Sequence, residues 1–122
     1  MRLWTRPEAN EVLAEIRVAI QNARALQFAA GQEANGLGQG GARSDSRPSM
    51  PAAEGLRTML CSLSRNGILV RDVEAGILDF ASRDADGNPM MLCWQVDEPA
   101  VRHWHSPQTG FASRKPLDDG AA

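Results

Sequence analysis

The spacing of apolar residues changes once along this 122-residue chain, at Asn66-Gly67, and this change constrains the fold more than any other feature. Before it, apolar side chains recur every three or four residues, as on one face of a helix. After it, apolar and polar side chains alternate, as in strands with one buried face. A helical half followed by a stranded half predicts an α+β domain, with an antiparallel two-helix hairpin packed on an antiparallel sheet.

The first helix is predicted over residues 6–30. Thr5 and Glu8 have the spacing of a capping box, and Pro7 stands in the first turn, where its missing N–H does no harm. The apolar stripe that follows steps by four and three residues and consists of Val12, Ile16, Ala19, Ala23, Leu26 and Ala30. This regular spacing predicts a single continuous helix.

A second, shorter helix is predicted over residues 51–65. Its apolar face consists of Ala52, Leu56, Met59, Leu60 and Leu63. Residues 31–49 are rich in Gly, Ser and Gln and have no period, so they predict a flexible loop between the helices. Because the first helix is the longer, part of its stripe has no partner within the hairpin. Either the sheet or a second subunit must cover it, and we expect a homodimer formed through the helices.

Four strands are predicted as a meander between residues 67 and 105. They consist of residues 68–72, 76–80, 90–96 and 101–105. If Asp72 opposes Gly76, the two faces of the first hairpin follow from alternation. One face then carries Ile68, Val70, Leu78 and Phe80, and the other carries Leu69, Arg71, Ile77 and Asp79.

The composition agrees with one globular domain. We expect this domain over residues 1–117, with a C-terminal loop at 106–117. Residues 118–122 are expected to be a disordered tail. Hydrophobic residues make up 43% of the chain, and the net charge is -2. Neither half is basic, so we expect no nucleic-acid partner. No segment approaches the about 20 apolar residues of a membrane span, so we expect no membrane contact and a cytoplasmic protein. Cys61 and Cys93 are expected to be buried, reduced thiols.

Residues 92–105 hold both histidines, two of the three tryptophans and one cysteine, and strand register decides which of them meet. Pairing Val96 with Val101 keeps the apolar side chains on one face. In this register, which we expect, Cys93 faces away from both histidines. A slip by one residue would instead place three possible metal ligands on one face, namely Cys93, His103 and His105.

Motifs along the chain resemble those of a known family. Motifs typical of the bacterial family named domain of unknown function 2203 occur at Gly76-Ile-Leu-Asp-Phe80, Leu92-Cys-Trp94 to Glu98, Trp104-His105 and Gly110-Phe-Ala-Ser-Arg114. The start of the chain, from Thr5 to Asn10, is similar too. His103 stands where the family has an aromatic residue such as Tyr, and Asp97 where it has Gly. The resemblance implies the fold and a bacterial cytoplasmic setting, and it supplies no activity.

No nucleophile elbow, phosphate loop or dinucleotide fingerprint is present. We therefore predict no catalytic residue and no cofactor, and expect a small non-catalytic interaction or scaffold protein with an unknown protein partner or ligand. A first alternative is a site for a small anion or other small ligand, possibly catalytic, at the end of the sheet. It would consist of Trp94, Glu98, Trp104, His105, Thr109 and Arg114. A second alternative is a metal site at Cys93, His103 and His105.

Each polar candidate also has a structural interpretation. Asp79, Glu98 and His105 are possible acid–base groups, because a histidine beside a carboxylate is a possible general base. The structural interpretation pairs Asp79 with Arg71 across the first hairpin and His105 with a backbone group. For the C-terminal loop, it places Phe111 as a plug at the end of the core and pairs Arg114 with Glu98 or Asp79.

Overall fold

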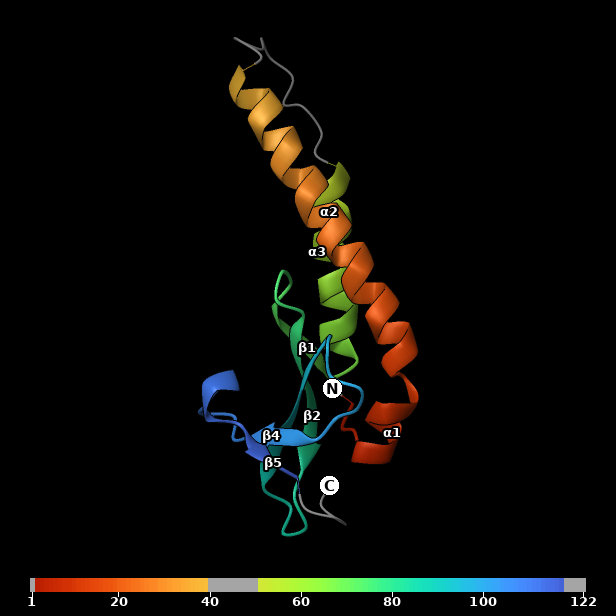
Figure 1. Ribbon diagram of the computed structural model, residues 1–122, viewed down its shortest axis with the longest axis vertical. Coiled ribbons are helices and arrows are strands. Elements are labelled where there is room, and N and C mark those ends of the chain that lie inside the picture. The colour runs from red at the N-terminus through yellow and green to blue at the C-terminus, as the bar shows by residue number, and fades with distance from the viewer. Residues whose placement is uncertain (1, 40–50, 118–122) are drawn as a thin grey trace.

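The structure is a computed structural model that describes residues 2–39 and 51–117. Three α-helices lie beside a five-stranded antiparallel sheet (Figure 1), which confirms the predicted α+β class. The helices are α1 (Arg6–Glu11), α2 (Leu13–Gln39) and α3 (Pro51–Arg65). The strands are β1 (Ile68–Asp72), β2 (Ile77–Arg83), β3 (Pro89–Gln95), β4 (His103–His105) and β5 (Lys115–Pro116). No helix within the described residues is long and apolar enough to cross a membrane.

The first helix begins as predicted, but it is not continuous. The Thr5 amide donates to Glu8 Oε1 at 2.9 Å and the Glu8 amide donates to Thr5 Oγ1 at 3.2 Å, which confirms the capping box. The helix is then interrupted at Val12, whose φ of -100° and ψ of 3° are not helical. The interruption separates α1 from α2. It lets Asn10 reach the sheet, where its Oδ1 accepts from the Val101 amide at 2.8 Å.

The prediction that residues 31–49 form a loop is wrong for its first part, because α2 continues to Gln39. Glycine in a helix costs about 1 kcal/mol, a cost that packing against a second helix offsets. The Glu33 carboxylate accepts from the Ala52 amide in the first turn of α3 at 3.2 Å, and Ala52 is buried. Residues 40–49 lie outside the described residues. Helix α3 has the predicted bounds.

The sheet has the order β1-β2-β3-β4-β5, so each strand pairs with its neighbour in sequence. The predicted meander of four strands is therefore extended by β5, which pairs Lys115 with Trp104 within a segment that we expected to be a loop. The same segment contains a short 3-10 helix, η1 (Phe111–Ser113). Phe111 is not the expected core plug, because it remains partly exposed, and Leu117 packs against the core instead.

Register is predicted well in the first hairpin and wrongly in the last. Between β1 and β2, Val70 pairs with Leu78, as expected, and the register shifts only beyond this pair. Between β3 and β4, Cys93 pairs with His103, which is neither of the two registers considered from the sequence. The predicted pairing of Val96 with Val101 is wrong because Val101 is fully buried without belonging to a strand.

Polar side chains of α1 and α2 fix the connection that precedes β4. Arg6 Nε donates to Val101 O at 3.1 Å, and Arg17 Nη2 donates to Glu98 O at 2.8 Å. Together with the bond from the Val101 amide to Asn10, these contacts hold the connection against the helices. Because the partners are about 80 to 95 positions apart in sequence, local patterns give no signal of them.

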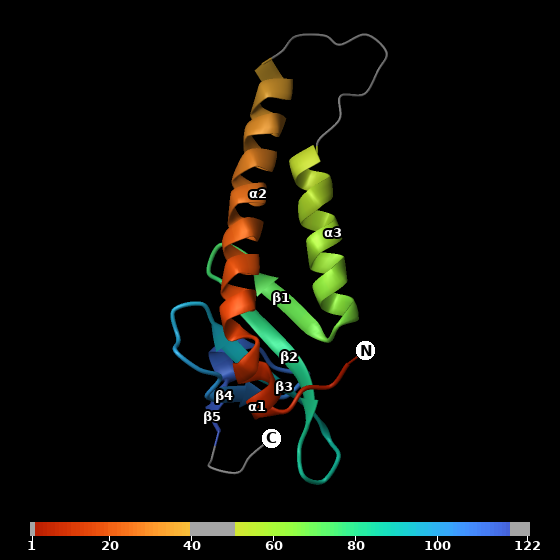
Figure 2. The same ribbon diagram turned by 90° about the vertical axis from the view of Figure 1, so that its right-hand side faces the viewer.

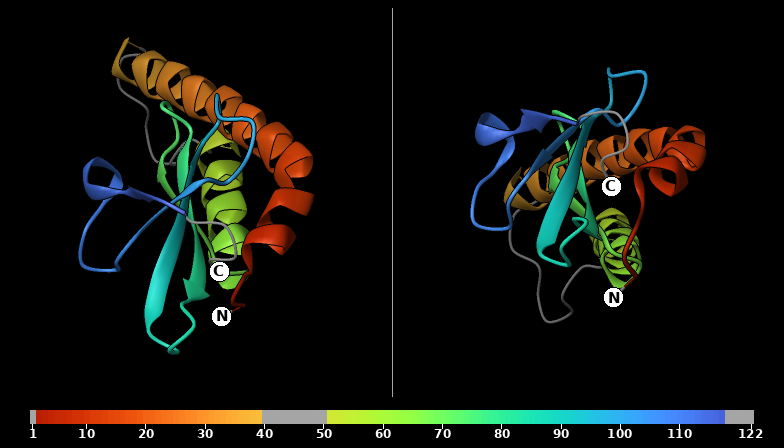
Figure 3. Two further views of the ribbon diagram at one scale, coloured as in Figure 1. Left: turned by 60° about the horizontal axis from the view of Figure 1, so that its bottom comes forward. Right: turned by 90° about the horizontal axis from the view of Figure 1, so that it is seen from below.

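The core lies between the helices and one face of the sheet. α1, the start of α2, strands β1 to β3, the N-terminal arm and the connection before β4 supply its members, which are Trp4, Ala9, Leu13, Ile16, Ile20, Ile68, Leu78, Phe80, Met90, Leu92, Trp94 and Val101. Figure 3 shows that the helices lie on one side of the sheet. The loop between β4 and β5 points away from the helices. α2 and α3 continue past the sheet side by side (Figure 2).

Two glycines with similar backbone angles allow a test of the packing at the junction of the two halves. Gly67 has φ of 74°, and a Cβ there would overlap the backbone oxygen of Arg2. Gly87 has φ of 83° and no atom within 4 Å of such a Cβ. We expect Gly87→Ala to lower the free energy of unfolding by about 1 kcal/mol and Gly67→Ala by more than about 3 kcal/mol. Urea unfolding followed by circular dichroism measures both. Equal losses would contradict the packing of the N-terminal arm on Gly67.

Candidate functional site

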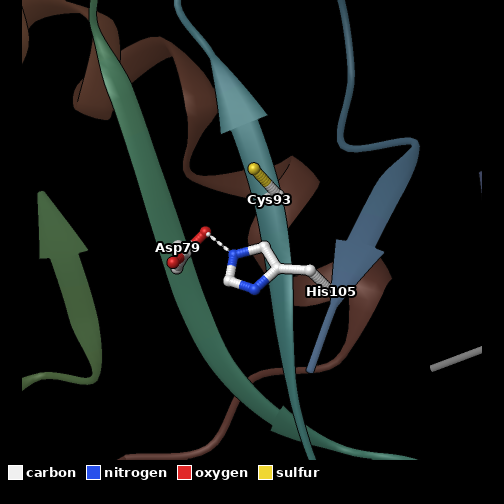
Figure 4. Close-up of side chains that lie close together, drawn as sticks. All are labelled: Asp79, Cys93 and His105. Atoms are coloured by element: carbon white, nitrogen blue, oxygen red, sulfur yellow. Dashed lines mark hydrogen bonds and ion pairs between the residues drawn. The ribbon is translucent and has the colours of Figure 1, made fainter. Parts of the chain in front are cut away.

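Three neighbouring strands bring Asp79, Cys93 and His105 together on the face of the sheet that points away from the helices (Figure 4). Asp79 and Cys93 are paired across β2 and β3, so their side chains share that face. His105 of β4 reaches Asp79 diagonally. One nitrogen, oxygen or sulfur atom from each residue lies within 4.8 Å of the others. The three residues have exposed fractions of 0%, 0% and 3%, so this polar cluster is buried.

Hydrogen bonds hold both ring nitrogens of His105. Nδ1 lies 2.7 Å from Ser106 O, and Nε2 lies 2.9 Å from Asp79 Oδ1. A carbonyl and a carboxylate only accept, and a neutral imidazole has a single N–H. When no other atom lies between the ring and Asp79, both contacts are hydrogen bonds only if one proton lies between Nε2 and Oδ1 in addition to the N–H of Nδ1.

Arg71 completes the environment of the buried carboxylate. Its Nε donates to Asp79 Oδ2 at 2.8 Å, while the rest of the Arg71 side chain is about half exposed. The predicted Arg71–Asp79 pair and the predicted bond from His105 to a backbone group are both confirmed. Each Asp79 oxygen therefore faces a different partner, Oδ1 facing His105 and Oδ2 facing Arg71.

A second polar group, built on Glu98 and Arg114, adjoins the first. Arg114 Nη1 and Nη2 donate to Glu98 Oε1 and Oε2 at 2.8 and 2.9 Å, a bidentate pair. The Gln95 amide also donates to Glu98 at 2.8 Å. Partial burial acts to raise the pKa of Glu98, but the bonds from Arg114 and the Gln95 amide outweigh it, and its pKa lies below its usual value. His103 Nδ1 lies 3.5 Å from Glu98 Oε2, without a hydrogen bond.

Cys93 lies between these two groups. Burial and the nearby charge of Asp79 raise the pKa of its thiol to about 12, and Arg114 only partly opposes them. At neutral pH Cys93 is therefore a thiol, which is a poor nucleophile. The expectation that Cys93 is buried is confirmed, whereas the same expectation for Cys61 is wrong, because Cys61 is exposed on α3.

The structure divides the ligand-binding residues proposed from the sequence. Trp94 is fully buried in the core on the helix side, where its Nε1 donates to Glu98 O at 3.0 Å. Trp104 also packs against the core. Neither tryptophan forms an aromatic wall beside His105, which is on the other face. Thr109 is exposed, and its hydroxyl donates to Ser106 O. Within this set, Glu98 and Arg114 form the one pair that binds through both side chains.

The structure also changes the expected ligand set for a metal. Cys93, His103 and His105 do share one face, as in the slipped register, but His103 turns towards Glu98. Asp79 occupies the third position instead. A signal for Asp79 existed in the sequence, because it is a single carboxylate between the large apolar residues Leu78 and Phe80. Only the pairing of β2 with β3 places it beside Cys93.

Two surface depressions lie on the helices. One is on α3 and is lined by Ala53, Leu56, Arg57, Leu60, Cys61 and Ser64. The other lies between α2 and the turn after β1 and is lined by Arg24, Gln27, Phe28 and Glu74. Neither of these two depressions is lined by a residue of the polar cluster.

The family model described as "Uncharacterized conserved protein (DUF2203)" matches residues 2–117. The chain belongs to this family. The resemblance noted from the motifs is thus confirmed, and the family description assigns no activity. No curated protein and no solved structure matches the chain. Five polar residues of the site lie in the segments that carry the resemblance, and they are Asp79, Cys93, Glu98, His105 and Arg114.

The pairing of Glu98 with Arg114 predicts how stability depends on pH. Because the pKa of Glu98 is lowered in the folded state, its contribution to stability is present above about pH 4.5, the usual pKa of a glutamate, and is lost as the pH falls through the folded-state pKa. We expect Glu98→Gln to lower the free energy of unfolding by about 1–3 kcal/mol at pH 7. The difference from wild type should shrink as the pH falls below about 4.

The control for this prediction is the neighbouring exposed carboxylate, Asp97. Asp97→Asn should change stability by less than about 0.5 kcal/mol. Chemical denaturation across a pH series measures both variants. A Glu98→Gln variant as stable as Asp97→Asn at pH 7 would show that the pair does not stabilise the fold.

Proposed function

We propose that this protein is a non-catalytic interaction protein that assembles as a homodimer through α2 and α3. The observation that carries the proposal is the exposure of α3. This helix has 15 residues and a clear apolar face, yet only Ala52 is buried. A helix with a mostly uncovered apolar face gains stability when another element covers that face.

The position of the helical hairpin supports this proposal. The start of α2 packs on the sheet and the end of α3 contacts β1, whereas the later part of α2 and the start of α3 extend past the sheet (Figures 1 and 2). In that part the two helices pack on each other. Two such hairpins related by a twofold axis would form a four-helix bundle, which covers the free sides of both.

The exposed residues of this region are partly apolar. Phe28 of α2 has an exposed fraction of 71%. Leu56 and Leu60 of α3 are partly exposed and line the depression on that helix. In this depression Ala53 lies two turns from Leu60, so that the small side chain leaves room for a large one from a second helix.

Charge favours a second copy as the occupant of this surface. Glu54 is in the first turn of α3 and Arg65 is in the last turn. A twofold axis near the middle of α3 would make the two α3 helices antiparallel. Glu54 of each copy would then lie near Arg65 of the other, with attraction at both ends of the contact.

The buried polar cluster agrees with a non-catalytic role. Its three residues are at most 3% exposed, and Cys93 is held as a thiol. A catalytic group must contact its substrate, so exposed surfaces are the better candidates for function. A bacterial cytoplasmic setting is part of the proposal and rests on the family resemblance.

Self-association is tested by sedimentation equilibrium at micromolar concentration. We expect the wild type to have the mass of two chains and Leu60→Glu to be a monomer with unchanged circular dichroism, because the new charge would be buried in the contact. Ser62→Glu is the matched control. Ser62 is exposed, and helical spacing puts it on the side of α3 away from the depression, so this variant should remain a dimer. A monomeric wild type, or equal effects of both variants, would overturn the proposal.

The antiparallel arrangement has its own test. Glu54→Arg or Arg65→Glu alone would place like charges together and weaken the dimer about three- to tenfold, or about 1 kcal/mol. The double exchange restores the opposite charges and should restore most of the affinity. Dissociation constants from dilution experiments at low salt measure the cycle. If the effects of the two changes simply add, Glu54 and Arg65 are not partners across the interface.

A further inference from the structure

We propose that Asp79, Cys93 and His105 form a metal centre that binds a thiophilic divalent ion such as Zn²⁺. The ligand atoms would be one carboxylate oxygen, the Cys93 sulfur and His105 Nε2. This inference is independent of the homodimer, because it concerns the face of the sheet opposite the helices.

The distances fit such an ion. Zinc binds sulfur at about 2.3 Å and nitrogen or oxygen at about 2.0–2.2 Å, so tetrahedral ligand atoms are about 3–4 Å apart. In the structure the three atoms lie within 4.8 Å of one another. They come from β2, β3 and β4, and Figure 4 shows all three side chains converging. Small side-chain movements would close the site around an ion.

The orientation of His105 is a second, independent observation. Nδ1 is fixed as a donor by Ser106 O at 2.7 Å. In the neutral ring Nε2 then carries a lone pair, which points at an Asp79 oxygen only 2.9 Å away. Two acceptors that face each other attract only through a proton or a cation between them. Metal-binding histidines commonly donate their other N–H to a backbone carbonyl, as this ring does.

Arg71 fixes the orientation of the Asp79 carboxylate in the same way. It donates to Asp79 Oδ2 at 2.8 Å and leaves Oδ1 directed at His105. Ligating carboxylates are usually held by such additional hydrogen bonds. With Ser106 O behind His105 and Arg71 behind Asp79, two of the three ligands have a fixed orientation before an ion binds.

Binding of the ion releases protons, and the charges that enter and leave the cluster are equal. Without the ion, the Cys93 sulfur carries a proton, and one proton lies between His105 Nε2 and Asp79 Oδ1. The ion replaces these two protons, which leave to solvent, and two new bonds form, from the ion to nitrogen and to sulfur. The charge of the cluster is unchanged, because two positive charges enter and two leave. Arg71, Glu98 and Arg114, the charged groups nearest the cluster among the described residues, keep their charges.

The chemistry of the ligands selects the class of ion. One sulfur and one imidazole nitrogen suit zinc, cobalt and similar borderline ions, whereas magnesium and calcium require oxygen ligands. Three protein ligands leave one position of a tetrahedral ion for water. Because the ligands belong to three adjacent strands, the ion would join the centre of the sheet to β4.

Cobalt(II) is the direct probe, because a thiolate bound to it gives an intense near-ultraviolet charge-transfer band. The full-length protein without a histidine tag is treated with a chelator, dialysed and titrated with Co²⁺ alone. We expect one ion per chain and the charge-transfer band. We also expect a loss of affinity of at least tenfold in His105→Gln and loss of the band in Cys93→Ser.

Two control variants keep this experiment specific. Cys61→Ser removes the exposed thiol, and His103→Gln removes the histidine that turns towards Glu98, so both should keep the band and the stoichiometry. A band lost in Cys61→Ser would place the ion on the surface thiol and overturn the proposal. Absence of stoichiometric binding to the wild type would overturn it as well.

Wild-type protein provides a measurement that does not depend on how the variants fold. Titration of Zn²⁺ in weakly buffered solution near pH 7 should release close to two protons per ion bound and raise the melting temperature. Binding without proton release would contradict a thiolate ligand.

Discussion

The buried charge of Asp79 constrains the arrangement of the sheet more than any other single group. A carboxylate with no exposure to water is tolerated only when paired charges and hydrogen bonds replace its solvation. β1 supplies Arg71 and β4 supplies His105, so the pairings of β1 with β2, of β2 with β3 and of β3 with β4 must all be in register. A one-residue slip of β4 would turn His105 to the other face and leave the carboxylate without one of its partners. The polar cluster therefore specifies the pairing of strands as well as forming a site.

The two faces of the sheet have different roles. The apolar face packs on α1 and the start of α2, which provides most of the hydrophobic stabilisation of a chain this small. The opposite face contains the polar cluster and, next to it, the Glu98–Arg114 pair. Cys93 connects the two polar groups, because it contacts both Asp79 and Arg114. The proposed metal centre and the proposed dimer therefore use separate surfaces of one fold.

Much of the helical half and of the first hairpin follows from local patterns. The capping box of Thr5 and Glu8 and the bounds of α3 were predicted correctly, because caps and apolar periods act over a few residues. The Arg71–Asp79 pair followed from alternation across a short turn. The end of α2 was missed because its glycine-rich continuation resembles a linker in composition, although it is helical as far as Gln39. Composition alone does not distinguish the two.

The sequence by itself determined the α+β class, the starts of α1 and α3, the first hairpin and the family, because each of these depends on neighbouring residues or on motifs. Only the tertiary structure decided which side chains form the site. The pairing of β3 with β4 depends on Arg6, Asn10 and Arg17, which hold the preceding connection from distant helices. That pairing exchanged His103 for Asp79 beside Cys93 and His105. The physical reason is that strand alternation turns a shift of one residue, set by distant contacts, into a change of face.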